Sequence, residues 1–204
     1  MNFLRNLMLL AVFVCNAGLA HAATITPDIS GQAGVVTELL PPAGTAIFPD
    51  SITVFGGGDA EGTLSAPNGL FNVFDGSIST NFDSDPLDIA FANPIYALQF
   101  NVGITDVDGI FLSGTLSLSV SGEVFDYVLG GGGYEAVAIA SNVGFQSASL
   151  SIFDFDTNAS SIAFIDANAI SVSTIAPIPL PAGGLLMLTG LLFVIGARRR
   201  VSET

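Results

Sequence analysis

Apolar and polar residues alternate with a period of two over several stretches of the chain. Between residues 116 and 121, Leu116, Leu118 and Val120 alternate with three serines. Successive side chains of a β-strand point to opposite faces of a sheet, so this pattern predicts a strand with one buried and one exposed face. Strands are also predicted at 46–55, 70–75, 87–91, 96–104, 124–129, 134–141, 143–154, 161–164 and 168–173.

Turn-forming residues separate these stretches. They are Gly56–Gly58, Pro67–Gly69, Asp75-Gly76, Asp108-Gly109, Gly130–Gly133 and Asp156–Asn158. Short strands at this spacing are typical of an all-β fold, an antiparallel β-sandwich or jelly roll of about eight to ten strands. The four consecutive glycines are predicted to form a flexible hairpin connection.

Two stretches allow finer predictions. Between residues 150 and 156 the apolar positions change parity, because Ile152 is followed at once by Phe153. An extra residue in one strand restores the parity, so a β-bulge is predicted near these two residues. Further along, Ile162 and Phe164 are predicted to share the buried face of their strand.

The first 22 residues have the organisation of a secretory signal peptide. Arg5 precedes an apolar run, Leu7–Val14, and the segment ends with small residues around His21. The run is too short to cross a bilayer as a stable anchor. Cleavage after Ala22 and export from the cytoplasm are therefore predicted, with an exported domain over 23–175.

The C-terminal segment, 176–204, has the organisation of a membrane tail. Its uncharged stretch 182–197 would span about 24 Å as a helix, somewhat less than a hydrocarbon core of about 30 Å. Arg198, Arg199 and Arg200 follow directly and predict a cytoplasmic C-terminus. One transmembrane helix is therefore predicted, with the preceding domain on the periplasmic side.

This tail resembles the PEP-CTERM sorting signals, in the VPLPA-type variant. The matching residues are Pro179, Leu180, Pro181 and Ala182, followed by the glycine- and leucine-rich span and the arginine cluster, with Ile178 where valine is usual. The resemblance implies an exosortase, a membrane-embedded cysteine transpeptidase, as the processing partner. It also implies transient inner-membrane anchoring, a final location at the cell surface or outside the cell, and association with exopolysaccharide or biofilm matrix. A simple single-span anchor would give the same topology.

The charge distribution excludes several classes of function. All four basic residues, the single histidine and the single cysteine lie in the two terminal segments, while every acidic residue except Glu203 lies between them. The exported domain therefore has no imidazole, thiolate, guanidinium or amine side chain. A Ser-His-Asp hydrolase, a zinc site of the usual type and nucleic-acid binding are excluded within it.

Carboxylates remain as the chemically active side chains, and their grouping makes calcium a candidate cofactor. Calcium takes six to eight oxygen ligands, which paired acidic residues on loops can supply. Solvated turn residues are the alternative interpretation. The candidate ligands are Asp83, Asp85, Asp88, Asp106, Asp108, Asp154, Asp156 and Asn158.

Three functions are compatible with these observations. The first is a non-enzymatic, exported surface or matrix protein, which the resemblance implies. The second is a calcium-assisted carbohydrate-binding module. The third is a secreted glycoside hydrolase that uses only carboxylates, and it would need two facing acids that the sequence does not pair. The main prediction is therefore a protein that is not an enzyme.

Overall fold

The computed structural model describes residues 23–41, 50–72, 76–81, 85–157 and 162–176. These residues form eleven β-strands and no helix, and all strand pairings are antiparallel. The all-β prediction is confirmed. Within the described residues no helix is long and apolar enough to span a membrane. The predicted signal peptide, sorting motif, membrane helix 182–197 and arginine cluster lie outside them.

The strands are distributed along the whole described chain. Their bounds are β1 Ala23–Thr26, β2 Val35–Leu39, β3 Ser51–Val54, β4 Gly62–Ser65, β5 Leu70–Asn72, β6 Ile78–Thr80, β7 Leu87–Thr105, β8 Phe111–Val120, β9 Glu123–Gly130, β10 Glu135–Phe155 and β11 Phe164–Ser173.

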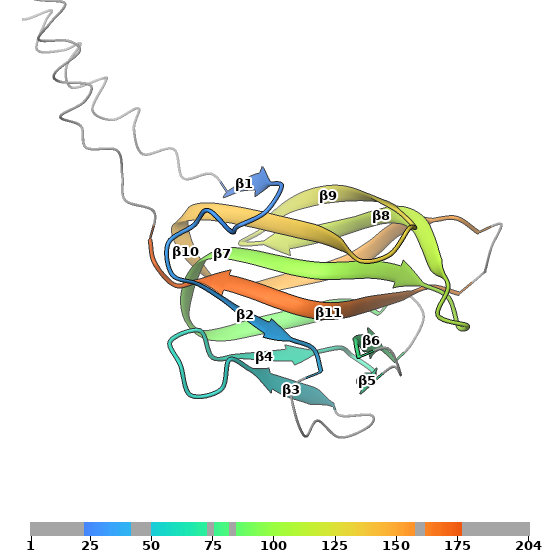
Figure 1. Cartoon of the computed structure of the whole chain (residues 1–204), viewed down its shortest axis with the longest axis horizontal. Coiled ribbons are helices and arrows are strands. Elements are labelled where there is room, and N and C mark those ends of the chain that lie inside the picture. The colour runs from blue at the N-terminus through green and yellow to red at the C-terminus, as the bar shows by residue number, and fades with distance from the viewer. Residues whose placement is uncertain (1–22, 42–49, 73–75, 82–84, 158–161, 177–204) are drawn as a thin grey trace, which may run out of the picture.

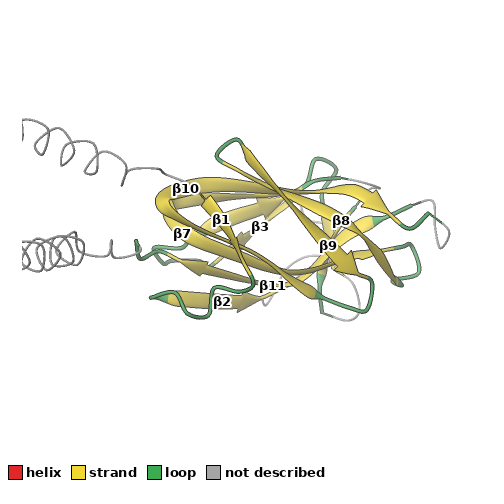
Figure 2. Ribbon diagram, turned by 90° about the horizontal axis from the view of Figure 1, so that it is seen from above, coloured by secondary structure: helices red, strands yellow, loops and turns green. Residues whose placement is uncertain are grey.

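Two long strands, β7 and β10, connect the two layers of the fold (Figure 1). Their pairing register shifts between Ala140 and Phe145, where both strands bend. Gly144 lies at this bend, and a Cβ atom there would come within 2.6 Å of Pro94 Cβ, so only glycine allows the two bends to pack together. Figure 2 shows the strands bending back at one end of the molecule. One hydrogen-bonded sheet is thereby folded into two facing layers, consistent with a β-sandwich.

The layers are defined by the halves of these long strands. The first layer has the order β3, β4, the first half of β7, the second half of β10, β8 and β9. The second layer has the order β1, the first half of β10, the second half of β7, and β11, which β2 and β6 join on its far side. β5 pairs with β6.

The core lies between the layers and follows the predicted alternation. Leu116 and Leu118 are fully buried, as are Phe100 and Val102 of the opposite layer. Each such side chain contributes about 1.5–3 kcal/mol when removed from water. The predicted bulge is confirmed, because the register of β10 against β8 shifts between Ile152 and Asp154.

Two finer predictions are wrong. At the start of β11 and just before it, Ile165 and Ala163 are buried, whereas Ile162 is 38% exposed and Phe164 is half-buried. The reason is the pairing of Ile165 with the buried Ile104, which sets the parity of the strand as far as the register shift between Ala167 and Ala169. The glycine segment 130–133 does not close a hairpin, because β9 pairs with β8 while β10 begins in the other layer beside β7. It carries the chain from one layer to the other.

The strand count also differs from the prediction. The predicted pairs 87–91 with 96–104, and 134–141 with 143–154, are continuous strands that bend. β1, β2, β4 and β6 are additional to the predicted strands. The turns at Gly69 and Gly109 are confirmed, and both glycines have the positive φ that such turns favour.

Candidate functional site

The outer face of the first layer carries four serines and one aspartate in register across five strands. Since the leucines of β8 face the core, its serines face outward. Strand pairing then aligns one residue from each of five strands in a row: Ser51 of β3, Ser65 of β4, Asp88 of β7, Ser149 of β10 and Ser119 of β8. On β9 the row ends at the exposed Val124. Neighbouring strands lie about 4.8 Å apart, so the row forms a regular line of polar groups.

Parallel rows flank this one, two residues further along the strands. On one side Thr53, Thr63, Ala90 and Ser147 are aligned. On the other side Ser151, Ser117 and Asp126 are aligned, and the Ser117 hydroxyl donates a hydrogen bond of 2.6 Å to Asp126 Oδ1. Most of the face is therefore made of short polar side chains.

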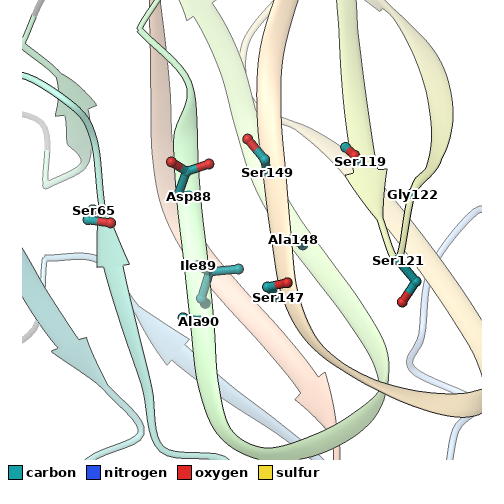
Figure 3. Close-up of a pocket in the computed structure, with 10 residues that line it drawn as sticks. All are labelled: Ser65, Asp88, Ile89, Ala90, Ser119, Ser121, Gly122, Ser147, Ala148 and Ser149. Carbon is teal, nitrogen blue, oxygen red and sulfur yellow. The ribbon is translucent and has the colours of Figure 1, made fainter.

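An open hollow of about 360 Å³ lies in this face. Its volume is within the range of small-molecule sites, about 300–1,000 Å³. Figure 3 shows Asp88 between Ser65 of one neighbouring strand and Ser149 of the other. The hollow is lined by Ser65, Asp88, Ile89, Ala90, Ser119, Ser121, Gly122, Ser147, Ala148 and Ser149.

Asp88 differs from the other carboxylates that are withdrawn from solvent. It is half-buried, yet no group among the described residues donates a hydrogen bond to its carboxylate, and the same holds for the hydroxyls of Ser65 and Ser149. The other buried or half-buried carboxylates of the described residues each accept at least one hydrogen bond: Glu38, Asp85, Asp106, Glu135 and Asp166. A ligand in the hollow would meet a carboxylate and hydroxyls that the described chain does not satisfy.

Asp85 and Asp106, two of the candidate calcium ligands, are buried and accept hydrogen bonds from the chain. Asp85 is buried and accepts two hydrogen bonds from the side-chain amide of Asn68, at 3.0 and 3.1 Å. Asp106 is buried and accepts from the backbone N–H groups of Asp108 and Ile110, both at 2.9 Å, so it closes its own turn.

The other candidate ligands are distributed over separate places. Asp108, Asp154 and Asp156 are exposed, and Asp88 lies in the hollow. Asp83 and Asn158 lie outside the described residues. Over the described ranges, no group of three or more acidic, histidine or cysteine side chains is placed to hold a metal ion. The calcium hypothesis stays a prediction.

The hollow provides hydrogen bonding and one negative charge. Asp88 is the only carboxylate among its described lining residues, whereas a glycosidase uses two carboxylates about 5–9.5 Å apart. Binding by hydrogen bonds is therefore the chemistry that these residues offer.

The outer face of the second layer is covered at both ends. At one end Ile29, 1% exposed, packs on Ala97 and Ala138, and its N–H donates a hydrogen bond of 3.0 Å to Gln99 Oε1. At the other end the ring of Phe111 lies over Gly103, where a Cβ atom would approach the ring to 2.5 Å. The first layer therefore presents the more open face.

Tyr127 closes the side of the sandwich between β9 and β10. Its hydroxyl donates a hydrogen bond to the carbonyl oxygen of Ala138, which belongs to the other layer. Burial raises the pKa of Tyr127 to about 12, since the charged phenolate is disfavoured away from water.

The serines of the hollow were not among the residues predicted for a site. The sequence does contain a signal for them, because Ser147, Ser149 and Ser151 repeat with the same period as the serines of β8. That repeat predicts an exposed strand face. Only the register between β4, β7, β10 and β8 shows that the serines meet around Asp88.

Comparisons with known proteins give distant structural likenesses. No family model and no curated protein matches the chain. A family two carbohydrate esterase from Cellvibrio japonicus has a TM-score of 0.35 at 10% identity, covering 72% of this chain and 36% of the esterase. A mutant family 29 carbohydrate binding module complexed with cellulohexaose has a TM-score of 0.34 at 12% identity, covering 71% of this chain and 99% of that one.

A third likeness is to the CBM22-1-GH10 modules of a Clostridium thermocellum xylanase complexed with xylohexaose. Its TM-score is 0.28 at 15% identity, covering 71% of this chain and 27% of that one. The chain thus spans about a third of the esterase and about a quarter of the xylanase modules.

Proposed function

We propose that the domain is a non-catalytic carbohydrate-binding module that holds a polysaccharide against the outer face of its first layer. The observation that carries this proposal is Asp88, a half-buried carboxylate in a hollow of hydroxyls that receives no hydrogen bond from the described chain. A sugar hydroxyl can donate to this carboxylate and exchange hydrogen bonds with the neighbouring serines.

The energetics favour an extended ligand over a single sugar. One net hydrogen bond contributes about 0.5–1.5 kcal/mol, and a bond to a charged group about 1.5–3 kcal/mol. The hollow alone therefore supports weak binding. The parallel rows of hydroxyls extend the polar face across five strands, so a polysaccharide could add contacts on both sides of Asp88.

The proposal includes export and sorting. The signal-peptide pattern of residues 1–22 supports secretion, and the PEP-CTERM-like tail at 176–204 supports processing by an exosortase-type enzyme. A surface or matrix location would bring the domain into contact with extracellular polysaccharide. Intact-mass analysis of the protein from cells with and without the sorting enzyme tests this part. Retention of Arg198–Arg200 in both strains would contradict it.

A glycan array followed by calorimetric titration tests the binding proposal. We expect binding to at least one class of polysaccharide, with an affinity that falls when Ser149 and Ser119 are both changed to alanine. A matched control is Ser113→Ala, an exposed serine of β8 outside the hollow. Repeating the titration in EDTA tests the calcium-assisted form of the proposal, since loss of binding in EDTA would show that binding requires a cation. Absence of binding across the array would contradict the proposal.

A further inference from the structure

Asp88 is the centre of a negative site for which no side chain of the exported domain supplies a countercharge. Residues 23–176 contain no Lys, Arg or His, so each ionised side chain in this segment is negative. No side chain of the domain can therefore form an ion pair with Asp88. Since like charges repel, an acidic polysaccharide would be disfavoured at this face.

The surroundings of Asp88 make its charge effective. The carboxylate is half-buried between strands β4 and β10, and its nearest cross-strand neighbours are Ser65 and Ser149. Partial burial reduces solvent screening, which strengthens an interaction with an opposite charge. A hydrogen bond between an ammonium group and a carboxylate is shorter and roughly twice as strong as one between neutral groups.

We propose that the hollow around Asp88 selects glycans that carry free, protonated amino groups. This inference rests on the proposed carbohydrate-binding function and names its ligand class. An amino-sugar ammonium would donate to the Asp88 carboxylate, while the sugar hydroxyls would bond to Ser65, Ser149 and Ser119. An N-acetylated sugar lacks the positive charge and loses the charge-assisted bond.

The test compares three oligosaccharides of equal length by calorimetric titration. They are a β-1,4-linked glucosamine oligomer, its fully N-acetylated counterpart and a neutral β-1,4-glucan, all at a pH where the sugar amines are protonated. We expect the amine form to bind about tenfold more tightly than the other two, which corresponds to about 1.4 kcal/mol. The preference should shrink as salt is added, because screening weakens the charge interaction.

Two variants separate a specific site from general attraction to an acidic protein. Asp88→Asn removes the charge in the hollow, and Asp59→Asn removes one charge from an exposed turn, so both change the net charge equally. We expect Asp88→Asn to abolish the preference for the amine form and Asp59→Asn to change it less than about twofold. Equal losses in both variants would overturn the proposal.

The outcomes also distinguish this inference from the proposed function. Equal binding of all three oligosaccharides, unaffected by Asp88→Asn, would overturn the amine preference and leave the carbohydrate-binding function standing. Binding of no glycan would overturn both. If the Asp88 variant does not fold, the carboxyl ¹³C resonance of Asp88 in the wild-type protein provides the test. It should shift on addition of the glucosamine oligomer and not of the acetylated one, and an unchanged resonance would overturn the proposal.

Discussion

Replacing Gly114 with alanine tests the packing between β8 and the bulged part of β10. A Cβ atom at this position would lie 2.5 Å from the carbonyl oxygen of Asp154, 2.7 Å from Ile104 Cδ1 and 3.0 Å from the Cα atom of Phe155. The first and third of these are main-chain atoms, so a side-chain rotation cannot relieve the overlap. The bulge at 152–154 would have to move.

The expected magnitude follows from two opposing effects. Overpacking of this kind costs about 1–3 kcal/mol. Gly→Ala also stiffens the unfolded chain, which stabilises the folded state by about 0.4–1 kcal/mol. With each effect at the middle of its range, the net loss is about 1.3 kcal/mol. For a domain of this size that corresponds to a fall in melting temperature of about 3–5 °C.

The matched control is Gly132→Ala, in the segment between β9 and β10. A Cβ atom there meets nothing within 4 Å, and the residue does not have a positive φ. Calorimetry should show an unchanged or slightly higher melting temperature for this variant. Equal melting temperatures for wild type, Gly114→Ala and Gly132→Ala would refute the argument that β8 and β10 are in tight main-chain contact.

Three further predictions concern single residues. Burial raises the pKa of Tyr127 to about 12, above an unfolded value of about 10, so its contribution to stability should be complete below pH 10 and decline as the pH rises towards 12. Ultraviolet absorbance of the phenolate measures this titration. A Tyr127 phenol that titrates near pH 10 in the folded protein would contradict the prediction. Ile29→Ala should lower the free energy of unfolding by about 2–5 kcal/mol, since the side chain is fully buried, and denaturant titration measures the loss against Ile25→Ala, an exposed control. Asp106→Ala should lower the free energy of unfolding by about 1–3 kcal/mol, because the N–H groups of its turn lose their acceptor. The control Asp108→Ala removes an exposed carboxylate from the same turn and should lower it by less than about 0.5 kcal/mol in the same assay.

The strands that could be predicted are those in which apolar residues at every second position are the buried ones. In the second half of β8, residues 116–119, the alternation of leucine and serine is unbroken, and the structure buries both leucines. The bulge near Ile152 was predictable as well, because one inserted residue is the simplest way for a strand to change parity and remain paired. β1 was not, since four residues, Ala23–Thr26, are too few to establish a period.

The continuity of β7 shows a limit of local patterns. Pro94 cannot donate to a strand ladder, so the sequence indicates two strands, 87–91 and 96–104. In the structure Pro94 lies at the bend, between Ala90 and Ile95, where β7 is not paired with β10. The backbone stays extended through the bend, and the chain changes layers without a loop.

The candidate site depends on information that a sequence pattern does not contain. Sequence proximity groups Asp88 with Asp83 and Asp85 as a calcium ligand. Its structural neighbours are Ser65 and Ser149, which come from strands 23 residues before it and 61 residues after it. Pairing between distant strands is set by how the whole core closes, and no local rule predicts it.

The sharing of β7 and β10 between both layers has a consequence for how the domain unfolds. Neither layer can detach while the other stays intact, because the same two backbones run through each of them. Native-state hydrogen exchange should therefore give the amides in both halves of these strands one common opening free energy, that of global unfolding. A ligand held at Asp88, on β7, would then slow exchange in the distant half of the molecule as well, and so protect the entire domain against proteolysis.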